Sequence, residues 1–193
     1  MANNNKQESD LTRAFICIDF PDEIIKEITR VQGAVGKVKF TGKLTEVENL
    51  HLTLKFLGEI DNKKLEDARE RLKKIKFSEM ELKLEKVGIF SYRGKPRIVW
   101  IKVAGKEIFE LQKNIDSALK DLLSPEERFM SHLTIARVKY AKDKKGFEKY
   151  IDGIEVKKLK FKIDRFKLKS SELGKTGPVY KDIEVYEAEK RND

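Results

Sequence analysis

Two short stretches of the chain follow the same pattern, and this repetition constrains the fold more than any other feature of the sequence. HLTL occupies residues 51–54 and HLTI occupies residues 132–135, and these stretches hold the only two histidines among 193 residues. After each stretch, the apolar spacing predicts the same order of elements: the rest of a strand, a helix and a long lysine-rich strand. We therefore expect two related lobes whose equivalent histidine strands face one cleft.

The spacing of apolar residues over the whole chain predicts a mixed α and β class. Strands are predicted at 13–20, 80–90, 97–103, 154–168 and 179–188, with a turn over 91–96. Helices are predicted from Asp22 onward, after Asp61 as N-cap, from 106 to 123 and from 144 to 151. The polar leader at 1–10 is expected to be flexible, and residues 11–193 are expected to form a single domain.

The composition excludes a disordered chain and favours anionic partners. Hydrophobic residues make up 39% of the chain and include 11 phenylalanines, which is enough for a packed core. Lysine and arginine number 42 against 33 acidic residues, and the net charge of +9 favours nucleic acid, nucleotides or anionic lipid. Surfaces rich in Lys and Glu are also typical of thermophilic proteins that bind no polyanion, so we expect a thermophilic source and leave the partner open at this point.

A single cysteine and the lack of long apolar runs indicate a cytoplasmic protein. Cys17 can form no disulfide within the chain, and its place in the apolar run FICI at 15–18 predicts a buried thiol. The leader has no apolar core of the signal-peptide kind, and no apolar run approaches the length of a membrane span. We expect no membrane partner.

The alternation of side chains along a strand predicts what each histidine stretch presents to the cleft. His51 and Thr53 share one face, and His132 and Thr134 share the equivalent face, while the aliphatic residues between them turn to the core. An unperturbed imidazole titrates near neutral pH, so two of them can divide the acid and base roles of one reaction. The two hydroxyls can bind phosphate oxygens, and the sequence has no HxH, HExxH or cysteine-pair pattern for a metal. This set predicts attack on a phosphodiester without a metal or a cofactor.

Each histidine taken alone is better explained as an ordinary residue of a half-buried strand, because a pattern as short as HxT often arises by chance. The pair is different, since both histidines are followed by Leu and then Thr. We therefore interpret the two frames as parts of one functional site.

Five longer stretches carry a family signature. They are RAFICIDFP at 13–21, ENLHLTLKFLGE at 48–59, VGIFSYRGKPRIVW at 87–100, SHLTIAR at 131–137 and LKSSELGKTGPVY at 168–180. With the two HxT frames they resemble the RNA 2′,3′-cyclic phosphodiesterases, also called 2′-5′ RNA ligases, of the 2H phosphoesterase superfamily. The resemblance implies an α+β, bilobal fold: two pseudo-symmetric lobes of antiparallel sheet with helices packed outside and a central groove carrying two HxTx motifs. It also implies metal-independent hydrolysis of a terminal 2′,3′-cyclic phosphate on RNA to a 2′-phosphate, with reversible 2′-5′ ligation by the same chemistry.

The resemblance further implies a role for each polar residue of the frames. His51 would be the general acid that protonates the departing O3′, and His132 the general base that activates water. Thr53 and Thr134 would bind the phosphate, and Arg137 would help to hold it. Strict alternation would place Arg137 on the face opposite His132, so this last role requires a β-bulge or a strand end between the two residues.

Three residues near the predicted turn are candidate RNA contacts. Phe90 and Tyr92 could stack on a terminal base, and Arg93 could contact the backbone. Equally, Phe90 could belong to the core and Arg93 to a solvated loop. The implied partner is RNA with a 2′,3′-cyclic phosphate end, including tRNA fragments, or a related nucleotide, bound by a monomer.

Two other functions stay open from the sequence. One is a non-catalytic module that binds RNA ends, for which we expect tight, salt-sensitive binding without a product. The other is a phosphodiesterase of small 2′-5′-linked or cyclic nucleotides, which should turn over short substrates as efficiently as RNA ends.

Overall fold

The computed structural model describes residues 11–175 and 177–190, and the leader predicted at 1–10 lies outside them. The strands are β1 (Thr12–Ile18), β2 (Thr41–Leu44), β3 (Leu52–Ile60), β4 (Met80–Tyr92), β5 (Lys95–Ala104), β6 (His132–Tyr140), β7 (Lys160–Ile163), β8 (Arg165–Leu173) and β9 (Pro178–Glu187). The helices are α1 (Asp22–Val35), α2 (Asn62–Leu72), α3 (Glu107–Leu119) and α4 (Lys144–Asp152), with a short 3-10 helix, η1 (Val47–Asn49). No helix among these described residues is long and apolar enough to cross a membrane.

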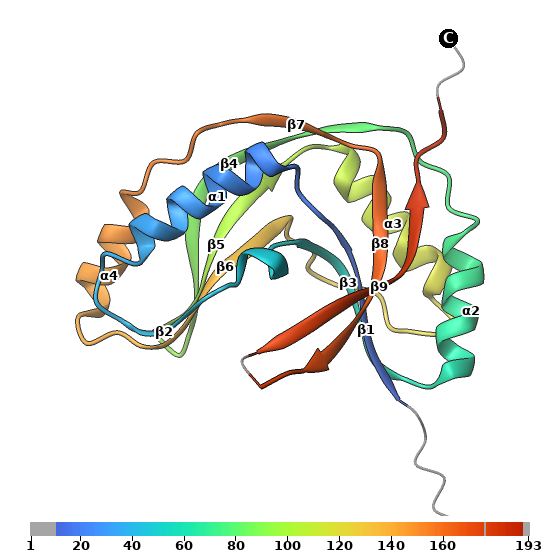
Figure 1. Cartoon of the computed structure of the whole chain (residues 1–193), viewed down its shortest axis with the longest axis horizontal. Coiled ribbons are helices and arrows are strands. Elements are labelled where there is room, and N and C mark those ends of the chain that lie inside the picture. The colour runs from blue at the N-terminus through green and yellow to red at the C-terminus, as the bar shows by residue number, and fades with distance from the viewer. Residues whose placement is uncertain (1–10, 176, 191–193) are drawn as a thin grey trace, which may run out of the picture.

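The strands form one curled antiparallel sheet (Figure 1). Within the described residues it has nine strands in the order β7-β4-β5-β6-β3-β1-β8-β9, and β2 pairs with the end of β6 outside this path. The two halves of the sheet meet where β3 pairs with β6, through Leu52 and Leu133. The class is α+β as implied, and the two expected lobes are the halves of one sheet, joined at their histidine strands.

Helices cover the outer face of each half of the sheet (Figure 1). Helix α1 packs against β6 and α4 against β4 and β5, whereas α3 packs against β3 and lies beside α2. Each helix turns a stripe of apolar side chains to the sheet; in α1 the stripe consists of Ile24, Ile28, Val31 and Val35. The core therefore lies between sheet and helices, and the inner face of the sheet is left to form a site.

The predicted helix starts are confirmed, but one helix end is not. Helix α1 begins at Asp22, and the carboxylate of Asp61 caps α2 by accepting a hydrogen bond from the amide of Lys64 (2.8 Å). Helix α3 ends at Leu119, although apolar residues continue to 123. The chain makes a turn there, and those later apolar side chains still pack on the core.

The chain crosses between the two halves after each histidine strand. From β3 it passes through α2 to β4, which pairs with β5 in the half that contains β6. From β6 it passes through α4 and β7 to β8, which pairs with β1 in the half that contains β3. The predicted order of strand, helix and long strand is confirmed after His51, whereas after His132 the long strand is divided into β7 and β8. Each repeat supplies a strand to the half that carries the other repeat's histidine.

The prediction of one continuous strand at 154–168 is wrong. The structure has two strands, β7 and β8, separated by Asp164 alone, and they stand far apart in the sheet order. The curl of the sheet brings the segment before β4 to the segment after β9, where the amide of Glu189 donates to the carbonyl of Phe77 (2.9 Å). A signal was present: buried apolar residues occupy odd-numbered positions in β7 (Phe161 and Ile163) and even-numbered positions in β8 (Phe166 and Leu168), so the alternation shifts by one residue at Asp164.

Two smaller differences concern β2 and the predicted turn at 91–96. The sequence analysis missed β2, because this strand is four residues long and three of them are exposed. The turn is shorter than predicted: Arg93 and Gly94 alone connect β4 to β5, with φ of 50° and 66°. Positive φ at both central residues is typical of the tight type I′ hairpin.

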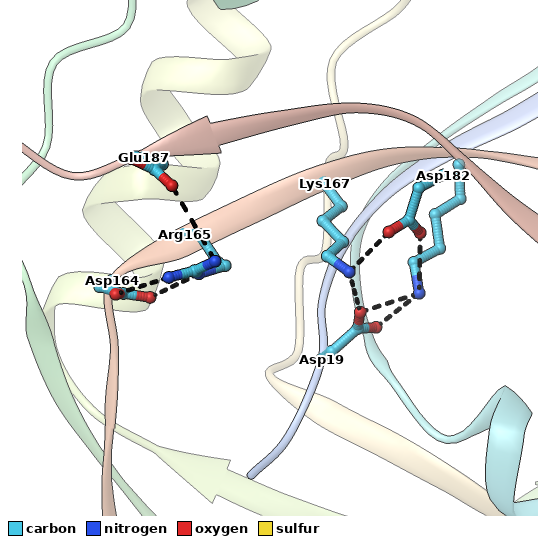
Figure 2. Close-up of polar contacts among 7 residues, drawn as sticks. Asp19, Asp164, Arg165, Lys167, Asp182 and Glu187 are labelled. Carbon is cyan, nitrogen blue, oxygen red and sulfur yellow. Dashed lines mark hydrogen bonds and ion pairs between the residues drawn. The ribbon is translucent and has the colours of Figure 1, made fainter.

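Charged side chains form a network on the half of the sheet that contains β3. Figure 2 shows Lys167 between Asp19 and Asp182, at 2.9 Å and 2.6 Å. Lys169 pairs with the same two carboxylates at 2.7 Å and 3.4 Å. Such networks contribute most at high temperature, where removing charges from water costs less free energy.

We expect the protein to unfold above the range of about 45–65 °C that is usual for mesophilic domains, because its ion pairs are linked into networks. Circular dichroism during heating measures the midpoint. A midpoint inside the mesophilic range would remove the expectation of a thermophilic source.

Gly88 on β4 leaves the space that the buried ring of Trp100 fills, and a methyl group at this position would overlap with that ring. We expect Gly88→Ala to lower the free energy of unfolding by about 1–3 kcal/mol, as overpacked cores do. Gly33→Ala in α1 is the matched control, because a methyl group there meets no atom within 4 Å. Helix propensity predicts that this control is more stable by up to about 1 kcal/mol. Urea unfolding measures the free energy of unfolding of both variants. An equal change in the two variants would contradict the packing argument.

Candidate active site

A groove of about 1000 Å³ lies on the inner side of the sheet, between its halves. All five polar residues predicted for the site line this groove: His51, Thr53, His132, Thr134 and Arg137. Residues of β1, β2, β5 and the β8–β9 hairpin complete the walls. The structure therefore brings the two frames, which are far apart in the sequence, into one cavity.

The register between β3 and β6 places the two frames opposite each other. Their central leucines, Leu52 and Leu133, pair directly and are fully buried in the core. One step from this pair in either direction, each histidine lies opposite the threonine of the other frame. The resulting pairs are His51 with Thr134 and Thr53 with His132. The polar groups of the site thus have approximate two-fold symmetry.

A β-bulge in β6 turns Arg137 into the groove. Val99 of β5 pairs with Ala136 and the next residue, Trp100, pairs with Thr134, so Ile135 is an extra residue on β6. Ile135 and Ala136 are both buried, and Arg137 is exposed and lines the groove. The predicted need for a bulge between the histidine and the arginine is confirmed.

The equivalent bulge in β3 turns Phe56 into the groove. Cys17 of β1 pairs with Thr53 and Ile16 pairs with Lys55, so Leu54 is the extra residue, at the same position in its frame as the bulged residue of β6. Phe56 is 66% exposed and lines the groove. The sequence analysis missed this residue because it considered a bulge in the second frame alone.

The helices on the outer face hold both bulges. The side-chain amide of Gln32 in α1 donates to the carbonyl of the bulged Ile135 (2.9 Å). In the other half, the ammonium of Lys55 points into the helix layer, where it pairs with Asp116 of α3 (2.5 Å) and donates to the carbonyl of Ser124 (2.7 Å). Each bulge is therefore anchored by a buried polar contact, which a regular strand would not need.

Both imidazoles are oriented by a backbone carbonyl two residues earlier. Nδ1 of His51 lies 2.8 Å from the carbonyl of Asn49, and Nδ1 of His132 lies 2.6 Å from the carbonyl of Met130. A carbonyl can only accept, so Nδ1 carries the proton in both rings and the lone pair of the neutral imidazole is on Nε2. Nε2 of His51 lies 3.0 Å from the hydroxyl of Thr53. Both Nε2 atoms are thus prepared to exchange protons.

Aromatic rings enclose each imidazole. Ring-centroid distances are 4.8 Å to Phe15 and 5.3 Å to Tyr180 for His51, and 5.0 Å to Phe90 and 6.4 Å to Trp100 for His132. Phe90 therefore packs beside His132 and is not part of the groove wall. This position fits the packing alternative of the sequence analysis better than an exposed surface for stacking a base.

Burial lowers the pKa of His51 to about 4, and the positive charge of Lys169 acts in the same direction. The hydrogen bond to the carbonyl of Asn49 and the charge of Asp19 oppose this shift without cancelling it. His51 is therefore neutral at pH 7 in the free protein. An anion bound beside its Nε2 would favour the protonated ring.

The other candidate RNA contacts lie on the β4–β5 hairpin, outside the groove wall. Tyr92 is 60% exposed, and the guanidinium of Arg93 lies 5.3 Å from the centre of its ring. Their contact with RNA stays a prediction. No group of three or more His, Cys, Asp or Glu suited to a metal occurs in the described part of the chain.

Comparison of the sequence with known protein families identifies the family of this chain. The model of the LigT-like phosphoesterases matches residues 18–100 and again residues 101–180. The chain belongs to the LigT-like phosphoesterase family. Because one family model matches twice, and each match contains one HxTx frame, the two halves of this phosphoesterase are related repeats.

Sequence relatives and solved structures with a similar fold were also found. Proteins named RNA 2′,3′-cyclic phosphodiesterase from Thermotoga maritima and Methanocaldococcus jannaschii are 35% and 36% identical, over 88% and 90% of this chain and 91% and 99% of theirs. A protein from Thermus thermophilus has a similar fold, with a TM-score of 0.76 and 24% identity over 91% of this chain and 97% of its own. E. coli LigT complexed with 3′-AMP has a TM-score of 0.74 and 22% identity over 93% and 99%.

We expect the imidazole of His51 to titrate near pH 4 in the free protein, and its pKa to rise when sulfate fills the groove, because an anion stabilises the charged ring. Sulfate serves as the probe because, unlike phosphate, it does not titrate in this range. An NMR titration of the ring resonances measures both values, with chloride at equal ionic strength as the control. An ordinary pKa in the free protein, or no rise with sulfate, would contradict the burial argument.

Proposed function

We propose that this phosphoesterase hydrolyses the 2′,3′-cyclic phosphate at the end of an RNA to a 2′-phosphate, without a metal. The observation that carries the proposal is the pair of imidazoles in one groove, each with its Nδ1 proton held by a carbonyl, so that the lone pair of the neutral ring is on Nε2. The printed names of relatives that are 35% and 36% identical over most of the chain support the substrate.

The reaction needs one proton taken up and one proton delivered. Nε2 of His132 accepts a proton from water, whose oxygen attacks phosphorus, while the bond from phosphorus to O3′ breaks. Nε2 of His51 donates a proton to the departing O3′, which leaves a 2′-phosphate and a 3′-hydroxyl. Thr53 and Thr134 donate hydrogen bonds to the non-bridging oxygens, and Arg137 pairs with their negative charge.

The low pKa of His51 in the free protein bears on its role as the acid. A neutral ring has no proton for O3′, so the ring must gain one as the substrate binds. The anionic phosphate supplies the reason, because it lies beside Nε2 in a buried site where charges interact strongly. Substrate binding and protonation of His51 are therefore coupled in this proposal.

The same arrangement can join two RNAs when a 5′-hydroxyl takes the place of water, which yields a 2′-5′ linkage. Small 2′-5′-linked or cyclic nucleotides remain the alternative substrates. Both histidines belong to one chain, so a monomer holds a complete site, and we propose that it acts as a monomer in the cytoplasm. RNA ends, including those of tRNA fragments, are the proposed partners.

We expect His51→Ala and His132→Ala each to lower the rate of cyclic phosphate hydrolysis by about 10²–10⁴-fold, the usual contribution of a general acid or base. The assay resolves the 2′- and 3′-phosphate products of an oligoribonucleotide with a 2′,3′-cyclic end, in the presence of a chelator. Circular dichroism of both variants confirms their fold. Wild-type activity in both variants, or loss of activity with the chelator, would overturn the proposal. RNA binding without any product would favour the non-catalytic module.

A second substrate separates the roles of the two histidines. In a cyclic phosphorothiolate with sulfur in place of O3′, the leaving group needs no proton. We expect His51→Ala to regain most of its activity on this substrate and His132→Ala to stay inactive, because water still requires a base. Rescue of the His132 variant instead would exchange the two roles.

A further inference from the structure

The net charge of the protein resides in three short segments. Segments 36–45, 92–98 and 136–142 contain no Asp or Glu and nine basic residues: Lys37, Lys39, Lys43, Arg93, Lys95, Arg97, Arg137, Lys139 and Lys142. The rest of the chain then has 33 basic and 33 acidic residues, so it is neutral. The charge of +9 is therefore not spread over the surface.

The fold brings these segments to one end of the sheet. Lys43 of β2 and Ile98 of β5 both pair with Arg137 of β6, from its two sides. The guanidinium of Arg97 donates to the carbonyl of Lys139 (3.1 Å), which ties the β4–β5 hairpin to the end of β6. Figure 1 shows β2, β6 and the hairpin converging at the lower left. We call the nine basic residues together the basic end.

The basic end has few counter-charges, because its three segments contain no acidic residue. All nine side chains are on exposed residues. Lys43 pairs with Glu46, but the other eight form no ion pair with any Asp or Glu of the described residues. On the half of the sheet that contains β3, by contrast, Lys167 and Lys169 are joined to the carboxylates of Asp19 and Asp182. Unpaired cations at this density repel one another, which favours an anionic partner.

The basic end is continuous with the groove. Arg137 and Lys43 belong to both, so a bound polyanion could run from the catalytic residues onto this surface. Two exposed aromatic rings, Tyr92 at 60% and Tyr140 at 59%, stand among the cations. Cations that follow a backbone together with rings on which bases stack are typical of surfaces that bind single-stranded nucleic acid.

We propose that the basic end binds the single-stranded RNA that precedes the cyclic nucleotide, so that the protein is an enzyme of RNA ends and not of free nucleotides. The inference rests on the proposed function, because the groove must hold the terminal phosphate. A membrane partner fits less well, since the charges lead into a groove and not onto a flat surface. The basic end thus supplies affinity for a chain of phosphates, and the groove supplies the chemistry.

The test removes charge from the basic end outside the groove wall. The variant carries Lys95→Gln, Lys139→Gln and Lys142→Gln together. With a cyclic-ended oligoribonucleotide we expect kcat/KM to fall about 10- to 100-fold, and the slope of its logarithm against log salt to become shallower by about 2, since each phosphate contact on a single strand contributes about 0.7. With 2′,3′-cyclic AMP, which has no preceding phosphate, we expect no change.

The matched control removes three lysines from the other end of the molecule. Lys63→Gln, Lys64→Gln and Lys74→Gln alter exposed residues in and just after α2, and change the net charge equally. We expect less than about a twofold effect on either substrate, as general electrostatic steering is weak at moderate salt. An equal loss in control and test variants, or an equal loss on cyclic AMP, would overturn the inference.

Binding of the same RNA, measured by fluorescence anisotropy, keeps the test independent of catalysis. If the wild type turns over no substrate yet loses RNA affinity with the three substitutions, the proposed function fails and the basic end stands as an RNA surface. If RNA affinity is unchanged while binding to phosphatidylserine vesicles is lost, the surface serves a membrane and the inference is wrong.

Discussion

The pairing of Leu52 with Leu133 is the contact on which the rest of the site depends. It joins the two halves of the sheet, and both leucines are fully buried beneath the helices. Because side chains alternate along a strand, burying the leucines turns His51 and His132 to the inner face. A shift of this register by one residue would exchange the two faces of a strand, so the hydrophobic core also specifies which side chains reach the groove.

The two bulges turn Phe56 and Arg137 into the groove, which a regular strand could not do. Without them, every second residue after each histidine would face the groove, and Phe56 and Arg137 would point into the core. The bulges occur at the same position of both frames, yet they deliver an aromatic ring on one wall and a guanidinium on the other. The repeats therefore provide symmetric proton-transfer groups and an asymmetric surface around them. We expect this asymmetry to favour one direction of a substrate in the groove.

Much of the fold and site could be predicted from the sequence, and the failures share one cause. The paired frames, the helix starts and most strands follow from local patterns of two and 3.6 residues, which report what a segment buries. These patterns do not report which strand is the partner. The change of partner at Asp164, the short β2 and the bulge that exposes Phe56 all depend on pairing between distant segments. The burial of Lys55 was missed for the same reason, since its partner Asp116 is on a helix of the other repeat.

The crossing of the chain between the halves has a consequence for how such a protein can arise. Each repeat carries one histidine strand, but its lysine-rich strand completes the sheet around the other histidine. A chain with a single repeat could bury its strands and assemble both imidazoles only by exchanging elements with a second copy, as a two-fold dimer. Fusion of two copies would preserve that interlocked arrangement and free each copy to diverge. In the present chain each repeat completes the sheet around the other repeat's histidine, so we expect neither half to fold without the other.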